Sequence, residues 1–240
     1  MHVQSLKFSV SFVMTHQDYV IEKATREDIA NIIEFLKKDF LVNEPLNAAM
    51  RIDINDATDF FNEIVNASLA DPVSYVVRNT KSQIIGVRLA CIIRRPTTPE
   101  EQRSVDENYT FFSTNEKTWR MRPVQKLLNH LENKIWDLVP QDIYTLLNWL
   151  VLSVDRNYTR RGIATQLIEY NWDEVRTLGC QGFVAEATAF KSQKLFERHG
   201  YYRLYTIELE QWKDENGEII FKCNDNTTLA TLEYLPLPKP

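Results

Sequence analysis

One short stretch of the sequence combines residue types that could bind an anion. In RNYTRRGIAT, Arg156 to Thr165, arginines stand directly before a glycine, an apolar run lies upstream and a helical pattern follows. A helix N-terminus leaves about four backbone N–H groups unpaired and carries a partial positive charge. Gly162 would let the backbone approach a ligand, Ala164 keeps the neighbouring position small, and Arg160 and Arg161 would add charge. The stretch therefore predicts a phosphate-binding corner between a strand and a helix.

The spacing of these residues narrows the kind of phosphate site. The sequence contains neither Gly-x-x-x-x-Gly-Lys-Ser/Thr nor Gly-x-Gly-x-x-Gly, which excludes the nucleotide-triphosphate loop and the dinucleotide fingerprint. What remains is a late strand followed by Arg-Arg-Gly-x-Ala at the start of a helix. A solvated basic turn is the alternative interpretation of so short a motif.

This arrangement resembles the GNAT superfamily of acyl-CoA-dependent N-acyltransferases, whose pyrophosphate loop reads Arg/Gln-x-x-Gly-x-Gly/Ala. Thr159 occupies the first position and departs from that pattern, a change for which Arg160 or Arg161 could compensate. The segment SQKLFERHGYYRLY, Ser192 to Tyr205, resembles the later helix, glycine and strand of the superfamily. The resemblance extends over nearly the whole chain from Tyr19 on.

The resemblance implies an acyl-CoA site, with acetyl-CoA as the acyl donor and no metal ion. The backbone of one strand would pair with the pantetheine arm, and the following loop and helix start would hold the diphosphate. The implied binding residues are Leu152, Ser153, Val154, Thr159, Arg160, Arg161, Gly162, Ile163, Ala164, Thr165 and Ser192.

Three segments look more specifically like the invertebrate-type arylalkylamine N-acetyltransferases. They are FLVNEPLN (Phe40 to Asn47), LSVDRNYTRRGIATQL (Leu152 to Leu167) and SQKLFERHGY (Ser192 to Tyr201). In that family a Glu-Pro-Leu turn after the first helix carries the general base, which implies this role for Glu44. An exposed turn carboxylate is the alternative. Because a free glutamate has a pKa of ~4.3 and is a poor base at neutral pH, Glu44 would have to work through burial or a water molecule.

Two hydroxyl side chains complete the implied catalytic group. Thr188 and Ser192 match a serine pair implicated in the catalytic and binding network of the arylalkylamine branch, although a strand-end threonine and a helix-capping serine would look the same. Many GNAT enzymes place a tyrosine where Phe196 stands, to protonate the thiolate, and phenylalanine cannot donate a proton. Ala189 replaces an asparagine common at the start of that helix, which puts one contact with CoA in doubt.

These residues lead to one main function and two alternatives. By resemblance, the chain transfers acetyl from acetyl-CoA to the primary amine of a small arylalkylamine of the dopamine, tyramine, serotonin or octopamine type, by direct attack on the thioester with Glu44 as general base. A polyamine, an amino acid or a protein N-terminus is the alternative acceptor. An acidic, deep pocket would suit polyamines, and an aromatic-lined one would suit arylalkylamines. Thr159, Ala189 and Phe196 motivate a third hypothesis, a CoA-binding module without turnover.

The composition agrees with a globular protein and disfavours several other classes. The chain has 240 residues, 44% hydrophobic and 25% charged, which predicts one domain at 19–240 after a leader or edge strand at 1–18. A net charge of −5 disfavours a nucleic-acid partner, which needs a basic face. Three widely spaced cysteines indicate neither a disulfide framework nor a zinc site and suit the reducing cytoplasm. Since no run approaches the ~20 apolar residues of a membrane-spanning helix, no membrane partner is expected.

Hydrophobic periodicity predicts the elements that must position these residues. The predicted strands are 18–25, 74–78, 84–93, 145–154, 182–187, 201–210 and 228–236. The predicted helices are 28–40, 58–69, 123–138, 163–179 and 191–200, with a turn at 43–47 and an irregular excursion at 94–115. Their mixed order predicts a three-layer α/β fold, and the resemblance implies a mixed, mostly antiparallel central sheet splayed at the acyl-CoA site.

Overall fold

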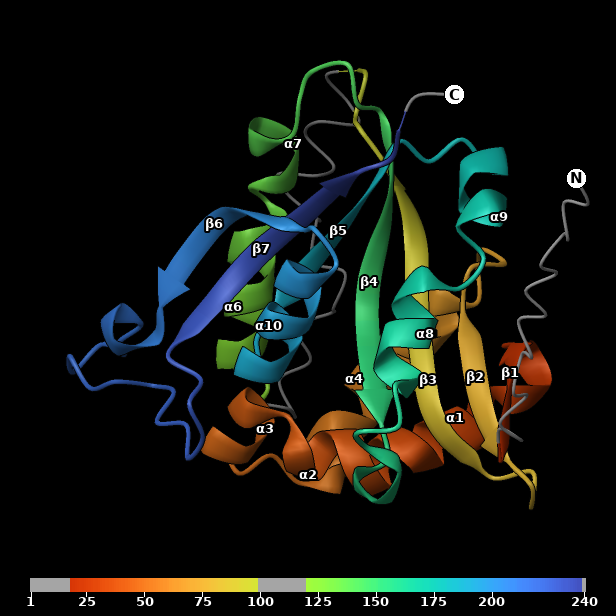
Figure 1. The fold of residues 1–240 in the computed structure, drawn as a ribbon. Helices are drawn as coiled ribbons and strands as arrows, with labels where there is room; N and C mark the ends of the chain where they lie inside the picture. Colours follow the sequence, from red (N-terminus) through yellow and green to blue (C-terminus); the bar gives the residue numbers. More distant parts are fainter. Residues whose placement is uncertain (1–17, 99–119, 239–240) are drawn as a thin grey trace, which may run out of the picture.

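The computed structural model of the chain describes residues 18–98 and 120–238 (Figure 1). The predicted leader or edge strand at 1–18 lies outside the described residues except for Asp18. Most of the excursion predicted at 94–115 also lies outside them. The fold below is that of the two described ranges.

A single mixed sheet organises the described part of the chain. Its seven strands are β1 (Tyr19–Lys23), β2 (Tyr75–Asn79), β3 (Ile84–Arg94), β4 (Thr145–Val154), β5 (Gly182–Ala187), β6 (Tyr202–Glu208) and β7 (Leu229–Pro236). They lie in the order β1-β2-β3-β4-β5-β7-β6, and β4 with β5 is the parallel pair while the other neighbours are antiparallel. The expectation of a mixed, mostly antiparallel sheet is confirmed.

Helices cover both faces of this sheet (Figure 1). On one face lie α1 (Ile29–Phe35), the π-helical turn η2 (Leu36–Phe40), α2 (Leu41–Asn43), α3 (Pro45–Ala49), α4 (Ile54–Ser68), α6 (Arg122–Glu132) and α7 (Ile135–Leu138). On the other lie α8 (Ile163–Glu169), α9 (Trp172–Thr177) and α10 (Phe190–Arg198). The three layers agree with the fold class expected from the sequence.

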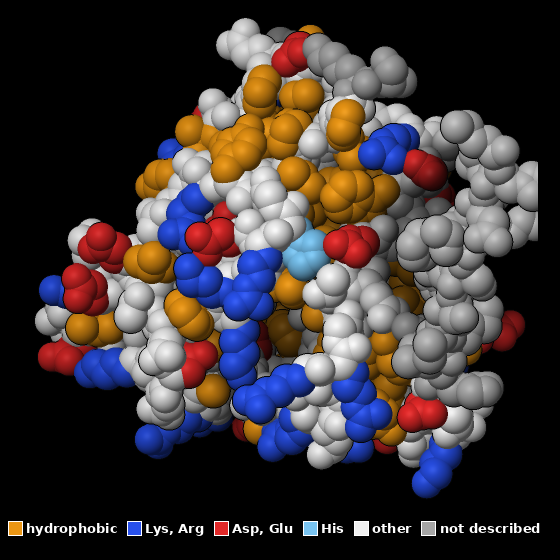
Figure 2. Space-filling model, in the orientation of Figure 1, with side chains coloured by type: hydrophobic (Ala, Val, Ile, Leu, Met, Phe, Trp, Pro, Cys, Tyr) orange, Lys and Arg blue, Asp and Glu red, His pale blue; other side chains and the backbone are white. Residues whose placement is uncertain are grey.

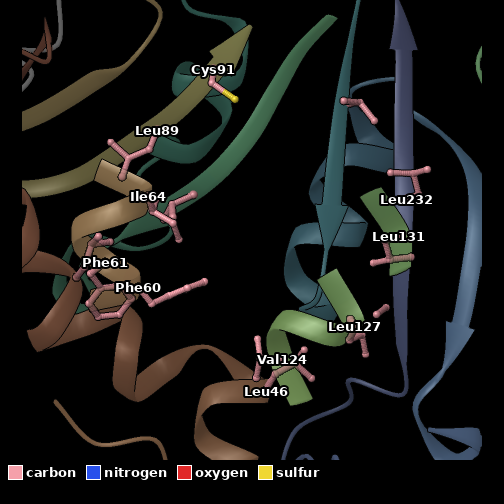
Figure 3. Close-up of a cluster of buried hydrophobic side chains, with 14 of the residues drawn as sticks. Leu46, Phe60, Phe61, Ile64, Leu89, Cys91, Val124, Leu127, Leu131 and Leu232 are labelled. Atoms are coloured by element: carbon pink, nitrogen blue, oxygen red, sulfur yellow. The ribbon is translucent and has the colours of Figure 1, made fainter. Parts of the chain in front are cut away.

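Side chains of β5 alternate between two hydrophobic clusters, because successive residues of a strand point to opposite faces. Val184 belongs to the cluster shared with α1, α4 and α6, whereas Phe183 and Ala185 belong to the cluster under α9 and α10. Figure 3 shows the first cluster, with Phe60 and Ile64 of α4 facing the sheet. Glu186 therefore points to the α4 and α6 side of the sheet.

The two central strands β4 and β5 separate part of the way along their length. Their pairing runs only from Leu147 opposite Phe183 to Trp149 opposite Ala185. β4 nevertheless continues to Val154, held by β3 on its other side. The splay expected at the acyl-CoA site is therefore present, and it leaves one edge of β4 unpaired with β5 beyond Trp149.

Three predictions in the N-terminal part of the chain, at 28–69, need correction. The first helical stretch continues through α2 to Asn43, and the turn predicted at 43–47 is reduced to Glu44, after which Pro45 opens α3. Proline suits that first position because its missing N–H would be unpaired there anyway. The second helix begins at Ile54 rather than near 58, because Asp53 and Asp56 form a capping box.

Two long predicted helices are each divided in the structure. The helix predicted at 123–138 is interrupted between α6 and α7 at 133–134. The helix predicted at 163–179 breaks between α8 and α9, where Asn171 takes a positive φ of 57°. The physical reason is Arg88, a buried side chain of β3 that donates to the carbonyl oxygens of Leu167 (3.0 Å) and Tyr170 (2.7 Å). The hydrophobic periodicity of the sequence does not show that the guanidinium group of a distant residue donates hydrogen bonds to these carbonyl oxygens.

Candidate active site

The splay between β4 and β5 opens a cleft of about 560 Å³. One wall is the outer half of β4, the other is the end of β5 with the start of α10, and the floor includes the end of α2. Figure 2 shows Lys and Arg side chains gathered around a hollow on this face of the molecule. Eight residues singled out from the sequence line the cleft, namely Glu44, Leu152, Ser153, Val154, Thr159, Ala164, Thr188 and Ser192.

The glycine corner borders one end of this cleft, because Thr159 and Ala164 line it while Gly162 itself does not. Gly162 is the N-cap of α8 with φ 78° and ψ 4°, a left-handed conformation that residues with a side chain adopt at a cost. No atom lies within 4 Å of the place where its Cβ would stand, so the corner is open. Arg160 and Thr165, which the sequence assigned to the same site, flank it outside the residues that line the cleft.

Two other residues of the corner have different surroundings. Arg161 is exposed and places its guanidinium 4.8 Å from the centre of the Tyr158 ring. Ile163 is only 2% exposed, and its side chain packs in a small core cluster with Leu167. Ile163 as a whole therefore offers little surface to a ligand, and its side chain anchors the helix that carries the corner.

A hydrogen-bond tether joins this corner to the segment that carries Glu44. The backbone N–H of Arg156 donates to Oδ2 of Asp39 at 3.0 Å, and its guanidinium donates to Oδ1 of Asn43 at 2.9 Å. Asn43 also donates to the side chain of Asp39. All three residues line the cleft. Their hydrogen bonds connect the segment that leads to the glycine corner with the segment that carries Glu44.

Glu44 is buried at the meeting point of α2, α3 and the end of β5. Its side chain is the N-cap of α3, where Oε2 accepts from the backbone N–H of Asn47 at 2.7 Å. Its other oxygen, Oε1, accepts from the hydroxyl of Thr188 at 2.9 Å. The exposed fraction of Glu44 is 8%, so the alternative of an exposed turn carboxylate is wrong.

Burial changes the acid strength of this carboxyl group. Desolvation raises the pKa of Glu44 from its ordinary 4.5 to about 7, and the hydrogen bonds from Asn47 and Thr188 oppose part of that rise. The nearby carboxylate of Asp225 raises it further. A carboxylate with a pKa near 7 is matched to removing a proton from an ammonium group at neutral pH.

The start of α10 contains the remaining positions noted in the sequence. Ser192 stands in the first turn of α10 rather than at its N-cap, which is Ala189, so Ser192 is not a capping serine. Phe196 is 3% exposed and packs against Trp149 and Tyr201, with ring centres 6.1 Å and 4.8 Å apart. The place of the expected tyrosine is therefore filled by an aromatic cluster that offers no hydroxyl at Phe196.

A second, smaller cavity of about 60 Å³ continues from the cleft toward α4 and α6. It shares a wall with the cleft through Phe40, Glu44, Leu150, Glu186 and Thr188. Its remaining lining residues among those described are Asn47, Phe60, Ile64, Val124, Leu128, Glu132 and Asn148. We call it the inner cavity.

The sequence interpretation missed the polar residues of the inner cavity and of the tether. Glu132 follows Val124 and Leu128 at intervals of four on the buried face of α6, and Asn148 and Glu186 interrupt the apolar runs of β4 and β5. The signal in the sequence is a polar residue at a position where the surrounding pattern predicts an apolar one. Periodicity assigns such a residue to the core without indicating its partners.

No group of three His, Cys, Asp or Glu residues within 18–98 and 120–238 is arranged to hold a metal ion. In the same two ranges, none of the helices combines the length and the apolar character needed to cross a membrane.

Comparison with known proteins gives matches to one family and one fold. Residues 141–201 match the model described as "Acetyltransferase (GNAT) family". This segment contains β4, the glycine corner and all of α10. The match therefore falls on the cleft wall and on the anion corner that the sequence singled out.

Solved structures resemble the chain over nearly its whole length. Arylalkylamine N-acetyltransferase 2 from Aedes aegypti is 24% identical with a TM-score of 0.76, over 92% of this chain and 99% of that one. Drosophila melanogaster polyamine N-acetyltransferase, described as forming N-acetylagmatine, is 19% identical with a TM-score of 0.74, over 92% and 100%. Arabidopsis thaliana NAA60 in complex with acetyl-CoA is 15% identical with a TM-score of 0.52, over 91% and 98%. At these identities the likeness shows a shared fold.

Proposed function

Because this chain carries an acetyltransferase domain of the GNAT family and is therefore an acyltransferase, we propose that residues 19–240 transfer acetyl from acetyl-CoA to a small primary amine, with Glu44 as the general base. The observation that carries the proposal is the position of Glu44. It is a buried carboxylate with a pKa near 7 on the wall of a cleft whose other end is the glycine corner. A single donor, acetyl-CoA, would reach from the glycine corner to Glu44.

The proposed binding of acetyl-CoA uses the backbone more than side chains. The diphosphate would lie at the backbone N–H groups around Gly162, and the pantetheine arm would pair with the edge of β4 at Leu152, Ser153 and Val154. Thr159, Ala164, Thr165 and Ser192 line or border this path, and Arg160 and Arg161 would add positive charge at the rim. The acetyl group would then reach the splay near Trp149, beside Glu44.

The proposed reaction begins with the amine as an ammonium ion. Glu44 takes its proton, directly or through one water molecule, and the freed nitrogen attacks the thioester carbon. The new C–N bond forms, the C–S bond breaks, and CoA leaves as a thiolate, while the surplus proton on the attacking nitrogen passes to water. Thr188 would hold the Glu44 carboxylate in place by its hydrogen bond, while Phe196 supplies no proton to the thiolate.

Two classes of amine have support from the walls of the inner cavity. Phe40 and Phe60 support the arylalkylamines expected from the sequence, because aromatic walls favour an aryl group. Glu132 and Glu186 support the alternative, a polyamine, because their carboxyl groups would pair with a second positive charge. The cytoplasm is the proposed location, supported by three cysteines that form no disulfide.

The test is the release of CoA with a panel of amines by the wild type and by Glu44→Gln. We expect kcat of the variant to fall at least about 100-fold, the size of a general-base contribution, with the Kd of acetyl-CoA unchanged. In the wild type kcat/KM should decline below pH of about 7, and the variant should lose that acidic limb. Turnover with tyramine would support arylalkylamines, and turnover only with spermidine would support polyamines.

The matched control is Asp53→Asn. Asp53 is also a helix N-cap carboxylate, at the start of α4, and it lines neither the cleft nor the inner cavity. Its variant should keep kcat, which separates the loss of a base from the loss of negative charge at a helix N-cap. An unchanged kcat in Glu44→Gln would remove Glu44 from the mechanism, and binding of acetyl-CoA without turnover of any amine would reduce the chain to a CoA-binding module.

A further inference from the structure

The inner cavity ends in a set of acidic and amide side chains from three elements. Glu132 comes from α6, Asn148 from β4 and Glu186 from β5, and all three line the cavity. Glu132 is 5% exposed and Asn148 is 1% exposed. Long-range packing of the sheet against α6 therefore gathers two carboxyl groups and an amide where water has little access.

Two oxygen atoms in this group have no hydrogen-bond partner within the described residues. They are Oε1 of Glu186 and Oδ1 of Asn148, both buried. Buried polar atoms in folded proteins are nearly always paired, and each one left unpaired costs free energy. Both atoms are acceptors, so the group that would satisfy them is a donor of hydrogen bonds.

The charges around the inner cavity point to the kind of donor. Glu44, Glu132 and Glu186 are acidic, and no lysine or arginine appears among its described lining residues. Burial raises the pKa of Glu132 well above its usual range, and the Glu186 carboxyl raises it further. Burial likewise raises the pKa of Glu186 to about 7. A cation between these carboxyl groups would offset the cost of ionising them.

The size of the inner cavity favours a slender group over an aromatic ring. Its volume is about 60 Å³. An apolar protein cavity that holds benzene measures ~150 Å³, more than twice as much. An ammonium or guanidinium group on a methylene chain is narrower than a ring, and the chain would lie along Phe40 and Phe60.

We propose that Glu132, Glu186 and Asn148 bind a second cationic group of the acceptor, so that this site acetylates diamines or aminoalkylguanidines in preference to amines with one charge. The inference rests on the proposed function, since the reacting amine would stand at Glu44. Glu44 and Glu186 share the wall between cleft and inner cavity, so the two ends of one short chain reach both places. The second cation takes part in binding and leaves the transfer chemistry unchanged.

The test compares two amines of equal length on the wild-type protein. These are 1,5-diaminopentane and hexylamine, which differ in that a terminal CH₃ replaces the second ammonium group, and tyramine serves as the aryl comparison. We expect kcat/KM for the diamine to exceed that for hexylamine and for tyramine by at least about tenfold, because a buried site built to accept hydrogen bonds rejects a ligand that lacks the donor. Equal or higher kcat/KM with hexylamine or tyramine would overturn the inference.

Glu132→Gln and Glu186→Gln test the assignment to these side chains. Each variant should lower the ratio of kcat/KM for diaminopentane over hexylamine by about tenfold, mainly through the KM of the diamine. A ratio unchanged in both variants would overturn the assignment. Melting temperature and acetyl-CoA affinity of each variant check that it folds, and the wild-type comparison decides the inference even for a variant that does not.

The outcomes also separate this inference from the proposed function. Turnover of hexylamine or tyramine without preference for the diamine would leave acetyl transfer intact and remove only the second-cation site. Binding of acetyl-CoA without turnover of any of the three amines would remove both.

Discussion

Glu44 illustrates how one residue can receive opposite influences from its surroundings. Desolvation raises its pKa, whereas hydrogen bonds from the backbone of Asn47 and the hydroxyl of Thr188 stabilise the ionised form and lower it. The balance, about 7, leaves a substantial fraction of Glu44 ionised at neutral pH and still able to accept a proton. Thr188 is therefore one of the groups that lower the pKa of the proposed base against the effect of burial.

Thr188→Val tests this role, because valine keeps the shape of threonine and lacks its hydroxyl. A hydrogen bond to the charged form lowers a pKa, so its loss should raise the pKa of Glu44 and move the acidic limb of kcat/KM upward. A net bond of ~1 kcal/mol corresponds to roughly 0.7 pH units. The measurement is the pH profile of kcat/KM, with Thr188→Ser as the control that keeps the hydroxyl and the wild-type limb. A limb that stays in place or moves downward in Thr188→Val would contradict the role.

At the scale of elements, the short helix α8 depends on contacts from outside itself. Its N-terminal side begins at Gly162 in a left-handed conformation, and its C-terminal carbonyls are taken by Arg88. Ile163 and Leu167 pack its buried side against the sheet. α8 is thus held at its C-terminal end and along one side, which gives the proposed diphosphate corner a fixed orientation.

Gly162→Ala should separate backbone strain from ligand binding. Alanine at a positive φ costs about 1 kcal/mol of stability, and its methyl group would project into the open corner. We expect that loss of stability together with a several-fold higher KM for acetyl-CoA. The control is Gly217→Ala, since Gly217 has φ 81° with equally open space, and no residue next to it lines the cleft, whereas Thr159 and Ala164 near Gly162 do. It should lose similar stability at an unchanged KM, whereas equal KM values in both variants would argue against a diphosphate at Gly162.

At the scale of the whole molecule, a net charge of −5 repels an anionic substrate such as acetyl-CoA. The local charge at the cleft differs from this average, because Arg156 and Lys191 line it and other Lys and Arg side chains surround the hollow in Figure 2. Separation of charge across the surface would therefore guide the anionic donor to one face. Screening by salt acts on such exposed charges most strongly.

The KM for acetyl-CoA should consequently rise with salt. Between about 20 mM and about 300 mM KCl the Debye length falls several-fold, so the attraction between the exposed basic side chains and acetyl-CoA is screened. We therefore expect the KM for acetyl-CoA to increase several-fold while kcat changes little. Lys191→Gln should start from a higher KM and show a weaker dependence on salt. Lys213→Gln, an exposed lysine that does not line the cleft, is the matched control and should follow the wild type. A salt-independent KM in the wild type would contradict steering by the basic rim.

Features that depend on neighbouring residues can be predicted from the amino-acid sequence. Strands β4 and β5 have the predicted bounds because a mostly apolar run is a local pattern, and the corner at Gly162 is recognisable because a glycine before a helical pattern is local too. The pattern also predicts the mixed order of strands and helices along the chain, from which the three layers follow. Motif similarity added the splay and the importance of Glu44.

Features that depend on residues far apart in the chain appear only in the folded protein. The bond between Thr188 and Glu44 spans 144 positions, and burial at that contact raises the pKa of Glu44. Arg88, a residue of β3, interrupts the helix predicted at 163–179. The packing of α6 against the sheet forms the acidic inner cavity. Periodicity records which residues are apolar, but partners, burial and the resulting acid strength arise only when distant segments pack together.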